Sequence, residues 1–92
     1  MLGITFIIPI FNTKIDYLEK CIKSVIKATS REDEIIIIND GSKKTISNYL
    51  DKYKNKISII QNKVNKGISF SRNLGILKSS KDYITFIDSD DF

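Results

Sequence analysis

The chain has 92 residues, of which 41% are hydrophobic and 28% are charged, and its net charge is +4 without any histidine. This length allows one small domain with a modest core. A single cysteine, Cys21, excludes an internal disulfide framework. It lies in a predicted helix, and we expect its side chain to have a packing role rather than a reactive one. The lack of histidine excludes His-based catalytic triads and zinc sites of the Cys/His type. The amino-terminal apolar run is too short to cross a membrane, so we expect a cytoplasmic chain without a membrane segment.

The first third of the chain predicts a strand, a helix and a second strand. The strand covers residues 4–10, and its regular pairing should fail near Pro9, which has no N–H to donate. The helix begins near residues 13–16 and ends before Thr29. The second strand, residues 34–39, contains four consecutive isoleucines, which favours a central strand covered on both faces. The helix carries an apolar stripe suited to packing on a sheet, formed by Leu18, Ile22, Val25 and Ile26.

The middle third repeats this alternation. The turn that follows the second strand contains Gly41, which permits a positive φ, and Ser42, which can cap the next helix. That helix covers about residues 43–53, and a third strand covers residues 57–61. The apolar face of the helix is formed by Ile46, Tyr49, Leu50 and Tyr53.

The last third predicts a helix over about residues 68–79, with an apolar stripe formed by Phe70, Leu74 and Leu77. Gly75 lies inside this helix and costs it about 1 kcal/mol relative to alanine. Close packing of the helix against the sheet would explain the glycine.

The uncharged run Tyr83–Ile87 predicts a final strand buried on both faces. Three carboxylates follow it, at Asp88, Asp90 and Asp91, and a sheet interior cannot hold that much uncompensated charge. We therefore place them at the carboxyl end of the strand, where Asp88 and Asp90 project to the same side. Such oxygen ligands suit Mg²⁺ or Mn²⁺. An acidic turn that merely ends the strand is the alternative.

The order βαβαβαβ predicts an α/β fold, a three-layer parallel sheet of Rossmann type with right-handed crossovers. The carboxyl ends of all four strands then meet at one edge, where ligands bind in open parallel sheets. Neither a G-x-G-x-x-G nor a G-x-x-x-x-G-K-[ST] motif is present. A metal that bridges carboxylate and diphosphate is therefore the alternative to a glycine-rich phosphate loop.

Five segments, in this order and spacing, resemble the amino-terminal, nucleotide-sugar-binding half of a family 2 glycosyltransferase of the GT-A fold. The resemblance covers essentially the whole chain, so that residues 1–92 form a single, truncated donor-binding domain. The segments are Ile8-Pro9-Ile10-Phe11-Asn12, Ile38-Asn39-Asp40-Gly41-Ser42, Asn65-Lys66-Gly67, Ser71-Arg72-Asn73-Leu74-Gly75-Ile76, and Tyr83-Ile84-Thr85-Phe86-Ile87-Asp88-Ser89-Asp90-Asp91.

The resemblance implies a UDP-sugar donor, Mn²⁺ or Mg²⁺ as cofactor, and a glycan or lipid-linked acceptor. It places no catalytic base in this chain, because the family carries that carboxylate and the acceptor pocket after the Asp-x-Asp. Many family members have Asp-Asp-Gly-Ser where this chain has Asn39, whose alternative role is a strand-end hydrogen bond. The implied donor contacts are Pro9, Ile10 and Phe11 for base and ribose, Asp40 for the base, Arg72 for the nucleotide or the acidic loop, Asp88 for the ribose or the metal, Ser89 for the nucleotide-sugar, and Asp90 for direct metal ligation.

Three other interpretations compete with the glycosyltransferase. A Mg²⁺-binding receiver-like module would need an acidic pair after the first strand, where Phe11 and Asn12 stand. A nucleotidyltransferase would need a glycine- and arginine-rich loop there. A nucleic-acid binder is disfavoured because the lysines are scattered. The chain ends directly after the acidic run, so we expect a fragment of a larger enzyme, whose cut sheet edge favours self-association.

Overall fold

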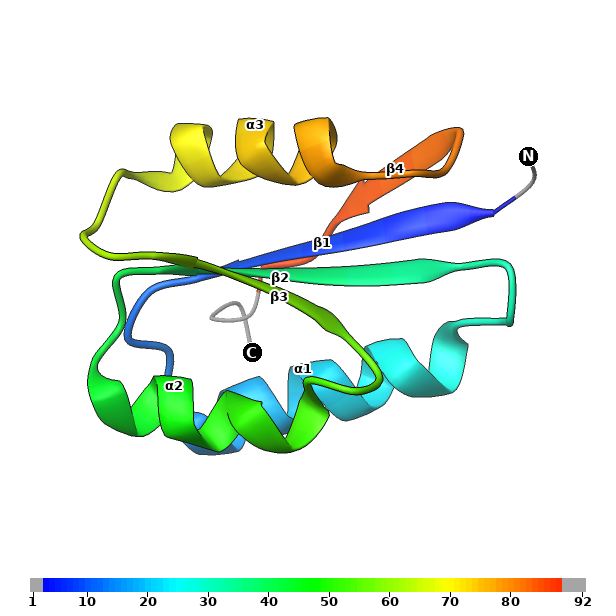
Figure 1. Cartoon of the computed structure of the whole chain (residues 1–92). Helices are drawn as coiled ribbons and strands as arrows, with labels where there is room; N and C mark the ends of the chain where they lie inside the picture. The colour runs from blue at the N-terminus through cyan, green and yellow to red at the C-terminus, as the bar shows by residue number, and fades with distance from the viewer. Residues whose placement is uncertain (1–2, 89–92) are drawn as a thin grey trace.

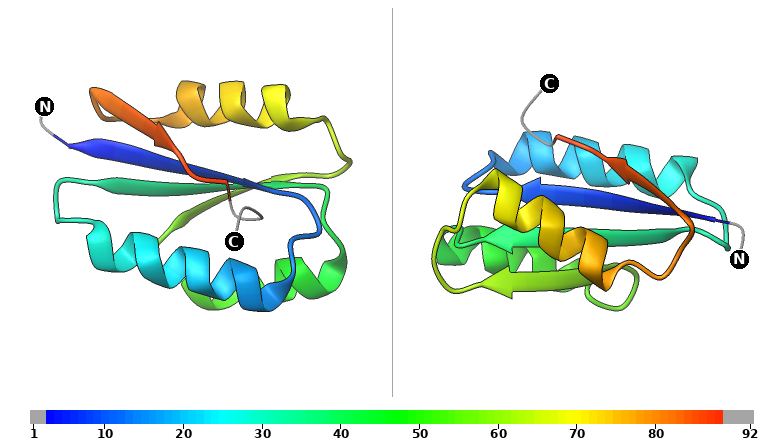
Figure 2. Two further views of the ribbon diagram at one scale, coloured as in Figure 1. Left: turned by 180° about the vertical axis from the view of Figure 1, so that it is seen from behind. Right: turned by 90° about the horizontal axis from the view of Figure 1, so that it is seen from above.

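The computed structural model describes residues 3–88, in which four strands alternate with three α-helices (Figure 1). All strands are parallel, in the order β3-β2-β1-β4. Helices α1 and α2 cover one face of the sheet and α3 covers the other (Figures 1 and 2). This confirms the predicted three-layer α/β fold. The elements are β1 (Ile4–Ile10), α1 (Ile15–Ala28), β2 (Glu34–Asp40), α2 (Lys44–Leu50), a 3-10 turn (Asp51–Tyr53), β3 (Ser58–Asn62), α3 (Ile68–Lys78) and β4 (Tyr83–Phe86).

Strands β1 and β2 form the centre of the sheet. Ile36, Ile37 and Ile38 in β2 are almost completely buried, which confirms that this strand is covered on both faces. The larger core lies between the sheet and helices α1 and α2. Within the predicted stripe of α1, Leu18, Ile22 and Val25 are buried, whereas Ile26 is 37% exposed. Cys21 is buried in the same core, as predicted, and burial raises the pKa of its thiol to about 11.

Helix α3 packs on the sheet through small residues, and its predicted apolar stripe is wrong. Ser71 and Gly75, four residues apart and therefore on one face, are buried. Leu74 is half-buried against the second core, but Phe70 is 46% exposed and Leu77 is 80% exposed. A Cβ added at Gly75 would lie 2.6 Å from Cγ2 of Ile7, which confirms the predicted close packing. The helix approaches too closely for large side chains to lie between it and β1.

Strand β4 is an edge strand, and the prediction that it is buried on both faces is wrong. In the part of the chain that the structure describes it pairs only with β1, and Tyr83 and Phe86 are 63% and 39% exposed. The apolar, β-branched composition of this segment suits an edge strand as well as a central one. Only the strand order distinguishes the two cases.

Pro9 affects one side of β1 only. Pairing with β4 ends at Ile7, whose carbonyl accepts from the N–H of Ile87 at 2.9 Å, so the prediction holds there. Pairing with β2 continues past Pro9 to Ile10, which contradicts it. Backbone groups two residues apart along a strand face the same neighbour, so the missing N–H of Pro9 falls on the β4 side, beyond the end of that ladder.

Of the two predictions made for the turn between β2 and α2, one is confirmed and the other is wrong. Gly41 has φ +77°, as predicted, and a side chain there would collide with the backbone of Val64 and Asn65. Ser42 does not cap α2: the cap residue is Lys43, which makes no side-chain cap hydrogen bond. Ser42 instead joins two loops at the site described below. Within residues 3–88, no helix combines the length and the apolar character needed to cross a membrane.

Candidate functional site

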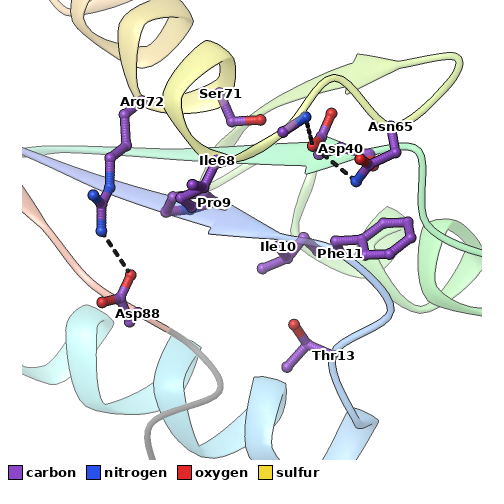
Figure 3. Close-up of a pocket in the computed structure, with 11 residues that line it drawn as sticks. Pro9, Ile10, Phe11, Thr13, Asp40, Asn65, Ile68, Ser71, Arg72 and Asp88 are labelled. Atoms are coloured by element: carbon purple, nitrogen blue, oxygen red, sulfur yellow. Dashed lines mark hydrogen bonds and ion pairs between the residues drawn. The ribbon is translucent and has the colours of Figure 1, made fainter.

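A pocket of about 490 Å³ lies at the sheet edge where the parallel strands end (Figure 3). This is the edge at which ligand-binding loops of open α/β sheets converge. Its walls come from the ends of β1, β2 and β4, from the loop that precedes α3, and from the first turns of α3. The lining residues are Pro9, Ile10, Phe11, Thr13, Asp40, Asn65, Gly67, Ile68, Ser71, Arg72 and Asp88.

The β1 end of the pocket is held to the neighbouring loop by Asn12. This residue has φ 50°, a left-handed conformation that asparagine tolerates better than most residues. Its N–H donates to Oγ of Ser42 at 2.9 Å, and its Oδ1 accepts from the N–H of Lys43 at 2.8 Å. The reciprocal pair connects the loops after β1 and β2. It thereby positions Phe11, which is 51% exposed, at the pocket wall.

Asp40, at the end of β2, accepts hydrogen bonds from the last residue of β3 and from the loop between β3 and α3. Its Oδ1 accepts from Nδ2 of Asn62 at 2.9 Å and from the N–H of Lys66 at 2.8 Å. Its Oδ2 accepts from Nδ2 of Asn65 at 3.1 Å and from the N–H of Gly67 at 2.9 Å. A carboxylate offers about four lone-pair sites, so these four donors fill its acceptor capacity.

The hydrogen bonds to Asp40 outweigh the cost of its burial. The residue is only 3% exposed, and burial alone would raise its pKa. The donors from Asn62, Lys66 and Gly67 stabilise the charged form, and the net effect is a lowered pKa. The Ser71 hydroxyl lies near enough to Asp40 to contribute to this lowered pKa, but its geometry forms no hydrogen bond with any described residue. Asp40 is therefore a buried carboxylate that stays ionised.

Asn39 precedes Asp40 and is completely buried. Its Nδ2 donates to Oγ of Ser47 at 3.0 Å and to Oε1 of Gln61 at 3.2 Å, and its Oδ1 accepts from the N–H of Ser42 at 3.2 Å. These contacts confirm the alternative role predicted for Asn39, a hydrogen bond at the end of the strand.

Arg72 and Asp88 form the charged side of the pocket. Nη2 of Arg72 lies 3.3 Å from Oδ1 of Asp88, and the guanidinium carbon lies 5.5 Å from the centre of the Phe86 ring. The side chains of the pair are 41% and 40% exposed, so solvent screens the attraction and its contribution to stability is small. Nε of Arg72 is buried without a hydrogen-bond partner among the described residues. Arg72 thus contacts the acidic segment, one of the two roles expected for it.

Most of the predicted donor contacts line this one pocket, namely Pro9, Ile10, Phe11, Asp40, Arg72 and Asp88. Their roles toward a ligand stay predictions. Ser89 and Asp90 lie outside the described residues. Within residues 3–88, no three acidic or cysteine side chains are grouped so that they could hold a metal ion.

Sequence analysis assigned no ligand contact to five residues of the pocket wall, namely Thr13, Asn65, Gly67, Ile68 and Ser71. Asn65, Gly67 and Ser71 stand in segments that carry the family resemblance, which is the signal that could have indicated them. Ile68 stands four residues before Arg72, on the first turn of the same helix. Thr13 follows the β1 end and carries no comparable signal.

The model of glycosyl transferase family 2 matches residues 5–92. The chain is 38% identical over 92 residues to the glycosyltransferase GlyA of Streptococcus pneumoniae serotype 4, and the match covers 97% of this chain but 13% of GlyA. The crystal structure of Staphylococcus aureus TarS 1-349 superposes with a TM-score of 0.84 at 25% identity, over 99% of this chain and 28% of the TarS 1-349 chain.

The same TarS segment has also been solved in complex with UDP-GlcNAc. The mannosyltransferase PcManGT from Pyrobaculum calidifontis, solved with GDP-Man and Mn²⁺, has a TM-score of 0.83 at 13% identity, over 95% of this chain and 27% of PcManGT, and shares the fold. These matches favour the glycosyltransferase interpretation over the receiver-like module, the nucleotidyltransferase and the nucleic-acid binder. The chain belongs to glycosyl transferase family 2 and has the GT-A type of fold.

Proposed function

We propose that this chain is the donor-binding segment of a glycosyltransferase that uses a nucleotide-diphospho-sugar, with a UDP-sugar as the donor. The observation that carries the proposal is the composition of the pocket. One side is formed by Pro9, Ile10 and the exposed ring of Phe11, and the opposite side carries the charged pair Arg72 and Asp88. A nucleotide diphosphate has the same two-part chemistry, an aromatic base and a charged tail.

In this arrangement the base and ribose lie against Phe11 and Pro9, near Asp40. The diphosphate lies toward Arg72, whose guanidinium is a planar donor suited to phosphate oxygens. The buried Nε of Arg72, which has no partner among the described residues, is an additional donor on this side. Ser89 would contact the donor near the ribose.

The residues present fit a divalent metal, Mn²⁺ or Mg²⁺. Such ions bind through one or two carboxylates plus substrate phosphates, and Asp88 supplies a carboxylate on the charged side of the pocket. Asp90 would be the second ligand. When bound, the ion supplies charge neutralisation at the departing nucleoside diphosphate. We assign no catalytic base to this chain. The acceptor is a glycan or a lipid-linked sugar, and the cytoplasm is the proposed compartment.

Isothermal calorimetry of UDP in the presence of Mn²⁺ tests the proposal, with Arg72→Gln and Arg31→Gln as matched variants. Arg31 is exposed in the turn between α1 and β2 and does not line the pocket. Loss of a charge-assisted hydrogen bond, worth about 1.5–3 kcal/mol, should weaken binding by Arg72→Gln roughly ten- to hundredfold. Arg31→Gln should bind like the unmodified chain.

Chelation of the metal should abolish the binding heat, and Asp90→Ala should reproduce that loss. Absence of Mn²⁺-dependent UDP binding at millimolar concentrations would contradict the donor-binding proposal itself. Equal affinities of Arg72→Gln and Arg31→Gln would contradict the orientation given to the diphosphate. Because the Arg72–Asp88 pair is exposed, the variant should remain folded, which circular dichroism checks.

A further inference from the structure

Ser71 is a buried polar residue whose hydroxyl lies near Asp40 without making a hydrogen bond within the described part of the chain. It is 0% exposed, and its Oγ has no hydrogen-bond partner among residues 3–88. A buried hydroxyl without a partner costs about 1–3 kcal/mol, and native structures contain few of them. Ser71 also lines the pocket, on the α3 wall between Arg72 and Asp40 (Figure 3).

The two partners that a serine at this position would ordinarily find do not take its hydroxyl. Helical serines often donate to the carbonyl four residues earlier, but the hydroxyl of Ser71 makes no such bond to the carbonyl of Gly67, which accepts only the backbone N–H of Ser71 at 3.1 Å among the described residues. The neighbouring carboxylate of Asp40 already accepts four hydrogen bonds, one from the end of β3 and three from the β3–α3 loop. The hydroxyl proton of Ser71 therefore remains available to a ligand, and serine can turn about its Cα–Cβ bond among staggered positions to present it.

The surroundings of Ser71 select the part of a nucleotide that can approach it. Asp40 is an ionised carboxylate, so this end of the pocket repels phosphate. The cation that attracts phosphate, Arg72, is turned toward Asp88 on the opposite side (Figure 3). Ile68 and Phe11 add apolar wall near Ser71. A neutral, flat ring with polar edge groups satisfies all of these conditions.

We propose that the Ser71 hydroxyl donates a hydrogen bond to a carbonyl oxygen of the donor's nucleobase. This inference rests on the proposed function, because it requires a nucleotide in the pocket. Ser71 is then a recognition residue for the base and makes no contact with the diphosphate. Without a nucleotide, the buried and unpaired hydroxyl lowers the stability of the protein. The bound nucleotide supplies the hydrogen-bond acceptor that the hydroxyl lacks.

The test compares Ser71→Ala with Ser69→Ala, an exposed serine two residues away in the same helix that does not line the pocket. Two probes are titrated with Mn²⁺, UDP and ribose 5-diphosphate, which lacks the base. Loss of one neutral hydrogen bond should weaken UDP binding by Ser71→Ala roughly two- to tenfold. Binding of ribose 5-diphosphate by Ser71→Ala should not change, and Ser69→Ala should match the unmodified chain with both probes.

Thermal unfolding without nucleotide gives an independent readout. Because Ser71 makes no hydrogen bond among the described residues, the midpoint of Ser71→Ala should stay close to that of the unmodified chain, whereas a structural hydrogen bond to Asp40 would make it fall clearly. Unchanged UDP binding by Ser71→Ala, or equal weakening with both probes, would overturn the inference while leaving the proposed function intact. Failure of the unmodified chain to bind UDP would instead overturn the proposed function, and this inference with it.

Discussion

At the scale of single residues, Asp40 holds the loop that forms one wall of the pocket. Asn65 and Lys66 are exposed, so apolar burial contributes little to the shape of this loop. The loop instead depends on four donors that meet one buried carboxylate. Hydrogen bonds to charged groups contribute about 1.5–3 kcal/mol each, more than those between neutral groups. The position of α3, and of Ser71 and Arg72 on it, follows from this contact.

Asp40→Asn should lower the free energy of unfolding by about 2–4 kcal/mol at pH 7, because an amide cannot accept from all four donors. The native pKa of Asp40 lies below its unfolded value, which is about 3.9. The stability it contributes is therefore fully present above about pH 4 and is lost as the pH falls through the native pKa. Urea denaturation at pH 7 and pH 3 should show the difference between the two proteins shrinking at the lower pH. Asp51→Asn, at an exposed carboxylate, is the control, and an equal deficit of Asp40→Asn at both pH values would contradict the account.

At the scale of elements, the contact between α3 and β1 is closer than its apolar content suggests. The helix buries Ser71 and Gly75, and Ile7 of β1 fills the space that a larger side chain at position 75 would need. Glycine therefore has a packing role here that compensates for its low helix propensity. The second core is correspondingly small and consists of Ile7, Ile36 and Ile38 with half-buried neighbours.

Gly75→Ala should destabilise the chain by about 1–2 kcal/mol. Overpacking costs about 1–3 kcal/mol, and the gain in helix propensity of about 1 kcal/mol offsets part of it. On an Ile7→Ala background the same substitution should be neutral or stabilising, because the colliding atoms are gone. Comparison of Asn73→Ala with Asn73→Gly, at an exposed position of the same helix, measures the glycine-to-alanine propensity gain alone. Denaturant midpoints decide the matter, and a stabilised single variant would show that the helix can move away from β1.

At the scale of the whole molecule, β3 and β4 are the two edge strands of the sheet, and among the described residues no further strand pairs with either of them. The β4 side also exposes apolar side chains. Leu77 is 80% exposed and Tyr83 is 63% exposed. Exposed apolar surface beside an edge strand is typical of regions that pair with another chain or segment. We therefore expect the isolated chain to self-associate through α3 and β4.

Sedimentation velocity over a range of concentrations should show this association, and Leu77→Glu should suppress it without loss of stability, since the side chain is almost fully exposed. Val64→Glu removes a comparably exposed apolar residue, at 59%, from the loop after β3, and should leave the association unchanged. A clean monomer at high concentration, or equal suppression by both variants, would contradict the assignment of the interface to α3 and β4.

The sequence alone determined the α/β class, the alternation of elements and the convergence of Phe11, Asp40 and Asp88 at one sheet edge. These features follow from local information. Apolar periodicity distinguishes strand from helix, and a helical crossover between successive strands makes those strands parallel. A parallel sheet then brings all strand ends to the same edge, whatever the order of the strands. Family membership rests likewise on short segments and their spacing.

Only the tertiary structure decided which strand lies at the edge, and therefore that Tyr83 and Phe86 are exposed. It also decided that Asp40 binds a loop 22 to 27 residues away, and that Arg72 meets Asp88 16 residues later. An apolar run has the same composition in a central and in an edge strand, and a carboxylate in a motif does not specify its donors. These outcomes depend on contacts between residues distant in sequence, which local periodicity does not encode.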